Sequence, residues 1–85
     1  MVDIFSLKPY VGWVVRVVSD PEGFVKEGIF VGYDGPDYDP EETEDMILIH
    51  TKAKEGGYRD YVVYKQGEIA EFIPIRKATK EEYEA

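Results

Sequence analysis

The stretch GIFVGYD, residues 28–34, decides which fold this sequence predicts. Its alternation of small and large side chains is typical of a β-strand. Gly28 and Gly32 fall on the same face of that strand. A glycine inside a strand often marks a sharp bend or the close approach of another backbone. Two on one face therefore predict a strand that curls, as a small barrel requires.

Apolar and β-branched runs on both sides of this stretch predict four further strands. Polar turns separate most of them: DPEG at 20–23, a pair of glycines at 56–57 and QGE at 66–68. Pro74 cannot donate a backbone hydrogen bond, so it should lie near a strand end or on an open side of the sheet. The five expected strands are 11–19, 24–34, 46–51, 58–65 and 69–75.

Both ends of the chain favour short helical segments. Ile4, Phe5 and Leu7 could form one apolar helical turn, which Pro9 keeps short. Near the other end, TKEE at 79–82 matches a capping box and predicts a short acidic helix or a frayed tail. We therefore expect a small barrel over residues 1–78 and an acidic C-terminal tail or short helix over 79–85.

The expected fold class is all-β: a small, strongly bent, open barrel of five strands with a short N-terminal helical turn. Closing a sheet on itself removes its edges, which is economical for so short a chain. If the barrel stays open, two edges remain at which subunits could pair. Burial between subunits would then supplement the limited core of a chain of 85 residues.

The composition narrows the class of protein. A chain of 85 residues predicts one domain, and with 44% hydrophobic residues it can build a core. It has no cysteine, so it has neither disulfides nor thiolate metal sites. No apolar run approaches the roughly 20 residues of a membrane span. The first residues lack the basic start and apolar stretch of a secretion signal, so a cytoplasmic location is expected.

The net charge of −8 is concentrated in one loop. Seven of the 18 acidic residues lie at 34–45, a segment without a basic residue. The rest of the chain has 11 acidic and 10 basic residues, a net charge of −1. The total charge argues against nucleic acid, which is bound mainly through lysine and arginine. Its uneven distribution leaves the other surfaces open to such a partner.

The acidic loop allows two functional interpretations besides a solvated run of charge. Asp37, Asp39 and Glu41 alternate as in a calcium loop. Glu42 stands where that loop needs glycine, however, and no glutamate follows at its twelfth position, so neither a metal nor another cofactor is predicted. In an oligomeric ring, these loops would gather on one rim, where they would repel RNA or attract a basic protein partner.

The sequence favours a protein without catalytic activity. His50 is the only histidine, and neither Ser6 nor Ser19 lies near it in the sequence. No nucleophile motif, phosphate-binding loop or pair of carboxylates stands out. We expect His50 to be a surface residue of a strand.

The order of these signals resembles the Sm-like family of small barrels, which assemble into rings. That family has a glycine before its first strand, a glycine within its second, and a glycine, an aromatic residue and an aspartate at the end of the second. The corresponding residues here are Gly12, Gly28, Gly32, Tyr33 and Asp34. An asparagine and an apolar strand follow in the family, and Asp45 and residues 46–48 take these places here.

The second motif of the family is an apolar strand, an arginine–glycine pair and a final apolar strand. VVYKQGEIAEFIPI, residues 62–75, resembles it, with Gly67 retained and Gln66 at the arginine position. The resemblance covers residues 4–75. It implies a homo-oligomeric ring in which the fourth strand of one subunit pairs with the fifth strand of the next.

Members of this family bind uridine- or adenine-rich single-stranded RNA around the central pore. The resemblance implies an RNA site formed by Tyr38 or Asp45 together with Lys65, Gln66 and Gly67. Lys65 could hold a phosphate, Gln66 could bond a base edge, and Tyr38 could stack on a base. The alternative for residues 65–67 is a tight turn in which Gly67 adopts a positive φ. The family's stacking position falls on Thr43 here.

Three more tyrosines, Tyr58, Tyr61 and Tyr64, are interleaved with cationic residues, as on a platform for single-stranded nucleic acid. Strand alternation puts Tyr61 and Tyr64 on opposite faces, so they cannot both contact one ligand. Of the four tyrosines Tyr38, Tyr58, Tyr61 and Tyr64, at least two should pack within the barrel or between subunits, and Tyr38 is the best candidate for stacking on a base. The sequence thus supports two functions: an RNA-binding or ribonucleoprotein-scaffolding ring, and an acidic ring that binds proteins and not RNA.

Overall fold

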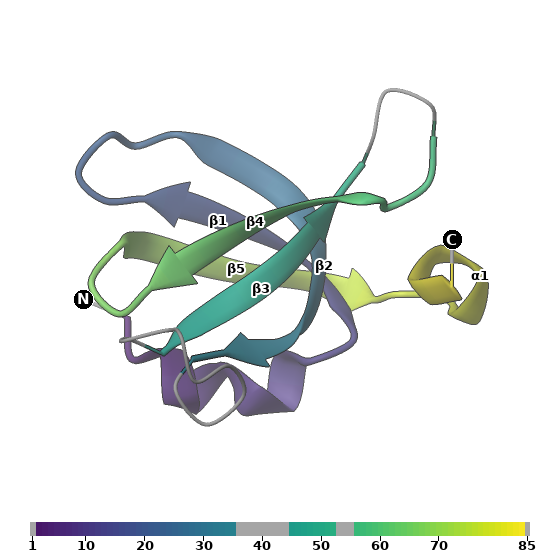
Figure 1. The fold of residues 1–85 in the computed structure, drawn as a ribbon, viewed down its shortest axis with the longest axis horizontal. Helices are drawn as coiled ribbons and strands as arrows, with labels where there is room; N and C mark the ends of the chain where they lie inside the picture. Colours follow the sequence, from purple (N-terminus) through teal and green to yellow (C-terminus); the bar gives the residue numbers. More distant parts are fainter. Residues whose placement is uncertain (1, 36–44, 53–55, 85) are drawn as a thin grey trace.

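The computed structural model describes residues 2–35, 45–52 and 56–84. These residues form one antiparallel sheet with a short helix at each end of the chain (Figure 1). The elements are the 3₁₀ helix η1 (Ile4–Tyr10), the strands β1 (Trp13–Ser19), β2 (Val25–Asp34), β3 (Met46–Thr51), β4 (Asp60–Lys65) and β5 (Ile69–Lys77), and the helix α1 (Lys80–Glu84). The all-β class and the five expected strands are confirmed.

The strand order in the sheet is β4-β3-β2-β1-β5. The sheet curls into a barrel-like body, with η1 beneath the strands in this view and α1 projecting to one side after β5 (Figure 1). The strands β4 and β5 are joined by a short turn but stand at opposite ends of the strand order. In the described part of the chain, each of them is therefore paired on one side only, and the barrel remains open.

Gly28 and Gly32 explain the bend in β2. A Cβ atom at Gly28 would collide with the backbone carbonyl of His50 in β3. Gly32 has a φ of +146°, a backbone conformation that other residues rarely adopt. Between Phe30 and Gly32 the register with β3 shifts, and Val31 has no partner there. Because Val31 is unpaired, Gly28 and Gly32 do not share one face as the sequence predicts: Gly28 pairs with Thr51 and Gly32 with Leu48, which point to opposite sides of β3. The two glycines and this bulge together let the strand curl around the core.

The bulge overturns another detail of the strand alternation. Strict alternation places Phe30 and Tyr33 on opposite faces of β2, and this is wrong. Their rings meet edge to face, with centroids 5.5 Å apart. The Tyr33 hydroxyl also donates a hydrogen bond of 2.8 Å to the carbonyl of Ile4 in η1. The unpaired Val31 accounts for the change, because one extra residue reverses the side to which later side chains point.

The core lies between the inner face of the sheet and η1. Val15 and Val17 of β1 are fully buried in it, as their shared face predicts. Ile4 and Leu7 of η1 close one end, so the expected N-terminal helical turn is confirmed as part of the core. The buried cluster consists of Ile4, Leu7, Val15, Val17, Phe30, Ile47, Ile49, Tyr64 and Ile69.

The C-terminal part extends beyond the expected bounds. The strand β5 continues to Lys77, and Pro74 lies within it beside a shift in register between Val14 and Val15 of β1. Because β5 is an edge strand, Pro74 still has the open side that the sequence predicts. Helix α1 follows, and Thr79 caps it as expected. No helix among the described residues is long and apolar enough to cross a membrane.

Candidate nucleic-acid interface

Lys65, Gln66 and Gly67 form the tight turn between β4 and β5. The Glu68 N–H donates to the Lys65 carbonyl at 3.0 Å, and Gly67 has a φ of +93°. The Glu68 carboxylate accepts a hydrogen bond of 2.8 Å from the Lys65 N–H and ties the turn from the other side. Gly67 is therefore required by the turn itself, while RNA contact by these residues stays a prediction.

The sheet brings Asp45 to the same end of the barrel as this turn. Met46 pairs with Asp34 of β2 on one side and with Lys65 of β4 on the other. Asp45 precedes Met46, and Gln66 follows Lys65, so both lie one step beyond that row of the sheet. Four of the five residues predicted to bind RNA thus share one end of the molecule: Asp45, Lys65, Gln66 and Gly67.

The side chain of Gln66 is engaged with the N-terminal segment. Its Oε1 accepts a hydrogen bond of 3.0 Å from the Ile4 N–H, and its Nε2 donates one of 3.0 Å to the Val2 carbonyl. These bonds fix the start of η1 to the β4–β5 turn. A contact between Gln66 and a base edge would have to share or replace them. Sequence reasoning missed this role, because the partners are 62 and 64 residues away.

The acidic loop is described only where it leaves and rejoins the sheet. Asp34 accepts a hydrogen bond of 2.8 Å from the Gly35 N–H. Gly35 lies directly against Asp45, since a Cβ atom there would collide with the Asp45 carboxylate. The two ends of the loop therefore meet beside the β4–β5 turn. Tyr38 and Thr43, together with the acids of the proposed calcium loop, lie outside the described residues.

Tyr61 and Tyr64 lie on opposite faces of β4, as strand alternation predicts. Tyr64 points into the core, where burial and the nearby Glu68 raise the pKa of its hydroxyl. Tyr61 is exposed on the other face of β4. Tyr58, just before β4, is half-buried, and burial together with the Glu82 carboxylate raises its pKa. The ring contacts among the described residues do not include Tyr58, Tyr61 or Tyr64, so these three tyrosines do not form one stacking platform.

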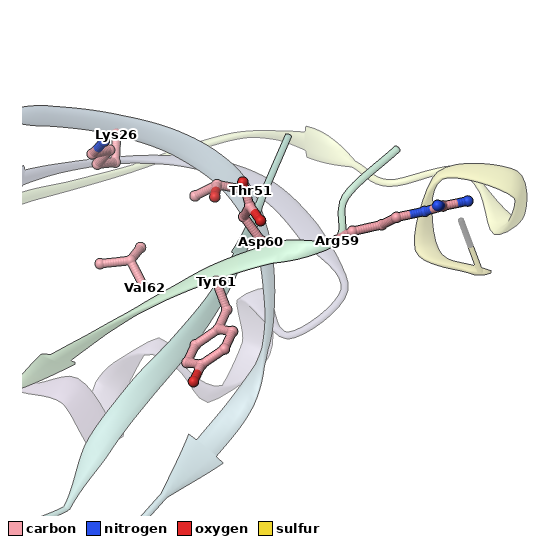
Figure 2. A pocket seen from close by; sticks show the side chains of 6 residues that line it. All are labelled: Lys26, Thr51, Arg59, Asp60, Tyr61 and Val62. Atoms are coloured by element: carbon pink, nitrogen blue, oxygen red, sulfur yellow. The ribbon is translucent and has the colours of Figure 1, made fainter. Parts of the chain in front are cut away.

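A hollow of about 480 Å³ lies at the other end of β4, away from the predicted RNA site. In Figure 2, Tyr61 points to one side of β4, Lys26 and Val62 lie on the other, and Arg59 extends toward α1. The side chains thus diverge around the free edge of the strand and do not converge on a ligand. The lining residues are Lys26, Thr51, Arg59, Asp60, Tyr61 and Val62.

His50 lies within the sheet. His50 is half-buried in β3, where it pairs with Ile29 and Tyr61. Within 2–35, 45–52 and 56–84, no three His, Asp or Glu side chains are grouped so that they could hold a metal ion.

Exposed apolar side chains mark both free edges of the sheet. On β4, Tyr61 is 68% exposed and Val63 is 37% exposed. On β5, Ile73 is 39% exposed and Ile75 is 42% exposed. Backbone donors and acceptors on an edge strand can pair with another chain, and apolar side chains favour that pairing. These edges are therefore the surfaces best suited to assembly.

No family model, curated protein or solved structure matches this chain. Functional inference thus depends on the chain's own geometry. Two features support a functional inference. One is the pair of apolar free edges, and the other is the end of the barrel at which Asp45 lies beside the β4–β5 turn.

Proposed function

We propose that this chain is a non-catalytic, Sm-like ring protein that binds single-stranded RNA or scaffolds a ribonucleoprotein. The observation that carries the proposal is the pair of free edges along β4 and β5, each with exposed apolar side chains. In the ring, β4 of one subunit pairs with β5 of the next. The two edges are different surfaces, and such head-to-tail contacts form a closed ring when the rotation between subunits adds up to a full turn.

Assembly would also supply burial that the single chain lacks. Small domains bury a limited fraction of their surface and gain stability by association. Tyr61 and Val63 of one subunit and Ile73 and Ile75 of the next would leave water together. Backbone groups along both edges would gain hydrogen-bond partners in the same step.

The proposed RNA site is the barrel end formed by Asp45 and the β4–β5 turn. A ring repeats this end once per subunit, so successive nucleotides would meet equivalent sites. Lys65 would hold a phosphate, while the Asp45 carboxylate or the Gln66 amide would bond a base edge. Tyr38 of the acidic loop would stack on a base. Repetition around the ring compensates for the small number of cations at each site.

Two measurements test this function. Light scattering after gel filtration should show a closed oligomer, and a monomer at micromolar concentration would remove the ring. Fluorescent uridine-rich and adenine-rich oligonucleotides should bind at low salt and more weakly at moderate salt. Lys65→Ala should weaken binding about tenfold or more, since a phosphate contact is lost. Lys80→Ala, which removes an equal charge from α1, is the matched control.

A second function, an acidic ring that binds a basic protein, is favoured by two observations. The chain carries a net charge of −8, and the Gln66 amide is already bonded to Val2 and Ile4. Replacing the five acids of 37–44 by their amides separates the two functions, because it leaves Asp45 of the proposed RNA site unchanged. The change should strengthen RNA binding if the loop only repels RNA. It should instead abolish binding of a polylysine peptide if the loop is the docking surface.

A further inference from the structure

The first turn of η1 presents an aromatic ring to solvent. The rings of Phe5 in η1 and Tyr33 in β2 are stacked, with 16° between their planes and 5.9 Å between their centroids. Tyr33 is packed against the core, whereas Phe5 is 59% exposed. Tyr33 therefore supports the Phe5 ring on one side, while much of that ring stays open to solvent.

Hydrogen bonds and ring contacts restrain both members of this stack. The Tyr33 hydroxyl donates to the Ile4 carbonyl at 2.8 Å, and the Tyr33 ring meets Phe30 edge to face. The Phe5 N–H donates to the Asp3 carboxylate at 3.0 Å, which caps η1. The rings are thus ordered before any ligand arrives, and a preorganised surface pays less conformational entropy on binding.

A lysine lies on the same side of η1 as Phe5. In a 3₁₀ helix, side chains three residues apart lie directly above one another. Ile4 and Leu7 follow this spacing, and both are buried. Phe5 and Lys8 follow it one residue later, and both are exposed. The open side of η1 therefore combines an aromatic ring with a cation, the two groups by which proteins commonly bind single-stranded nucleic acid.

The start of η1 is bonded to the β4–β5 turn, which belongs to the proposed RNA site. Gln66 of this turn accepts a hydrogen bond from the Ile4 N–H and donates one to the Val2 carbonyl, each 3.0 Å long. Figure 1 shows the N-terminal segment beside the turn. Phe5 directly follows Ile4 in the chain. The bonds from Gln66 thus bring the exposed ring of Phe5 next to the proposed RNA site.

We propose that Phe5 and Lys8 form a subsite of the RNA site, in which a base stacks on the open side of Phe5 and Lys8 holds a phosphate. This inference rests on the RNA binding proposed above. Gln66 is then a positioning residue that holds η1 at the turn, and Asp45 is left to bond a base edge. Every base has a face that can stack, so the subsite accepts uridine and adenine alike.

Titrating variants of the full chain with fluorescent uridine-rich and adenine-rich oligonucleotides tests the subsite. Phe5→Leu keeps an apolar side chain but removes the ring, and it should weaken binding of both oligonucleotides about fivefold to a hundredfold. Phe5→Tyr keeps a ring and should bind as the wild type does. The matched control is Phe24→Leu, which should leave binding unchanged. Phe24 is 67% exposed and directly precedes β2, at the opposite end of that strand from Tyr33.

The salt dependence of binding tests the role of Lys8. Lys8→Gln should reduce the slope of log affinity against log salt by about 0.7, because one phosphate contact is lost. Phe5→Leu should leave this slope unchanged, since a stacked base releases no counterion from a phosphate. A slope in Lys8→Gln equal to that of the wild type would overturn the phosphate contact.

A double variant tests whether Gln66 acts through η1. Gln66→Ala should weaken RNA binding, because the start of η1 is no longer held at the turn. Adding it to Phe5→Leu should cause no further loss, since both changes remove the same stacking contact. Losses that multiply in the double variant would mean that Gln66 contacts RNA itself, and its positioning role would be overturned.

The outcomes separate the subsite from RNA binding as such. A wild-type chain that binds neither oligonucleotide at low salt would end both proposals. Wild-type binding that Phe5→Leu leaves unchanged would overturn the subsite alone. Weaker binding that accompanies loss of the oligomer in light scattering would assign Phe5 to assembly, which also overturns it. NMR of the wild type needs no variant: a stacked base should shift the Phe5 ring protons upfield, and unchanged signals at saturation would refute the stacking.

Discussion

Gly28 of β2 lies so close to the carbonyl of His50 in β3 that no side chain fits between them. A Cβ atom at Gly28 would also come within 2.8 Å of the Ile49 side chain. The sheet can bend sharply here because β2 has no side chain at this point. The curvature of the barrel therefore depends on having glycine at position 28.

Gly28→Ala should destabilise the fold, because the two backbones must move apart to admit a methyl group. We expect a loss of about 1–3 kcal/mol in the free energy of unfolding, the usual cost of overpacking. Urea denaturation measures it. Gly23→Asn is the control, since Gly23 has open space and a φ of +74° that asparagine tolerates. An unchanged midpoint for Gly28→Ala would mean that the close approach does not determine the bend.

Gln66→Ala should loosen the N-terminus, because the Ile4 N–H and the Val2 carbonyl both lose their bonds to this side chain. At about 0.5–1.5 kcal/mol for each bond, the free energy of unfolding should fall by roughly 1–3 kcal/mol. Hydrogen exchange at the Ile4 amide should become faster in the same variant. Glu71→Ala, an exposed change in β5, should leave both quantities unaltered, and equal exchange in the two variants would refute the role of Gln66.

Tyr33→Phe tests the second attachment of η1. It removes the hydrogen bond of 2.8 Å to the Ile4 carbonyl but keeps the aromatic contacts with Phe5 and Phe30. We expect a loss of about 0.5–1.5 kcal/mol in urea denaturation. Because Gln66 and Tyr33 both hold Ile4, their combined effect should differ from the sum by about 0.5 kcal/mol or more. Strict additivity would show that the two attachments act independently.

Val63→Lys should prevent assembly, because a charged side chain on an edge strand opposes pairing with another chain. Val63 is exposed, so the single chain should remain folded by circular dichroism. Light scattering should show loss of the oligomer. Val25→Lys is the control, since Val25 is an exposed valine of β2, a strand within the sheet. A ring that survives Val63→Lys would exclude the β4 edge as the contact surface.

The contact between Arg76 and Glu82, with hydrogen bonds of 2.6 and 2.8 Å, should resist mild acid. Hydrogen bonds from Arg76 and Thr79 lower the pKa of Glu82 from its ordinary 4.5 to about 2. A lowered pKa stabilises the folded chain above pH 4.5, and this contribution is lost as the pH falls through 2. Carboxyl NMR should therefore show Glu82 titrating near pH 2, and Arg76→Gln should return the midpoint toward its ordinary value. A wild-type midpoint near 4.5 would contradict the bidentate contact.

The sequence by itself determined the features that depend on short-range patterns. The strand at 46–51 was predicted with its observed bounds, because five of its six residues are apolar or β-branched and polar segments flank it. Thr79 and Glu82 are three residues apart, so their capping bonds could be read from local spacing. Gly28 and Gly32 indicated curvature, since only a bend or a close approach favours glycine within a strand.

Only the tertiary structure decided which distant residues meet. The bulge at Val31 depends on the register with β3, and it places Phe30 and Tyr33 on one side against strict alternation. The bonds from Gln66 to the Ile4 N–H and from Tyr33 to the Ile4 carbonyl join segments far apart in the chain. Periodicity and capping reflect interactions between residues a few positions apart, so they are visible in the sequence. Long-range partners depend on strand order, register and bend, and these are fixed only when the whole sheet has formed.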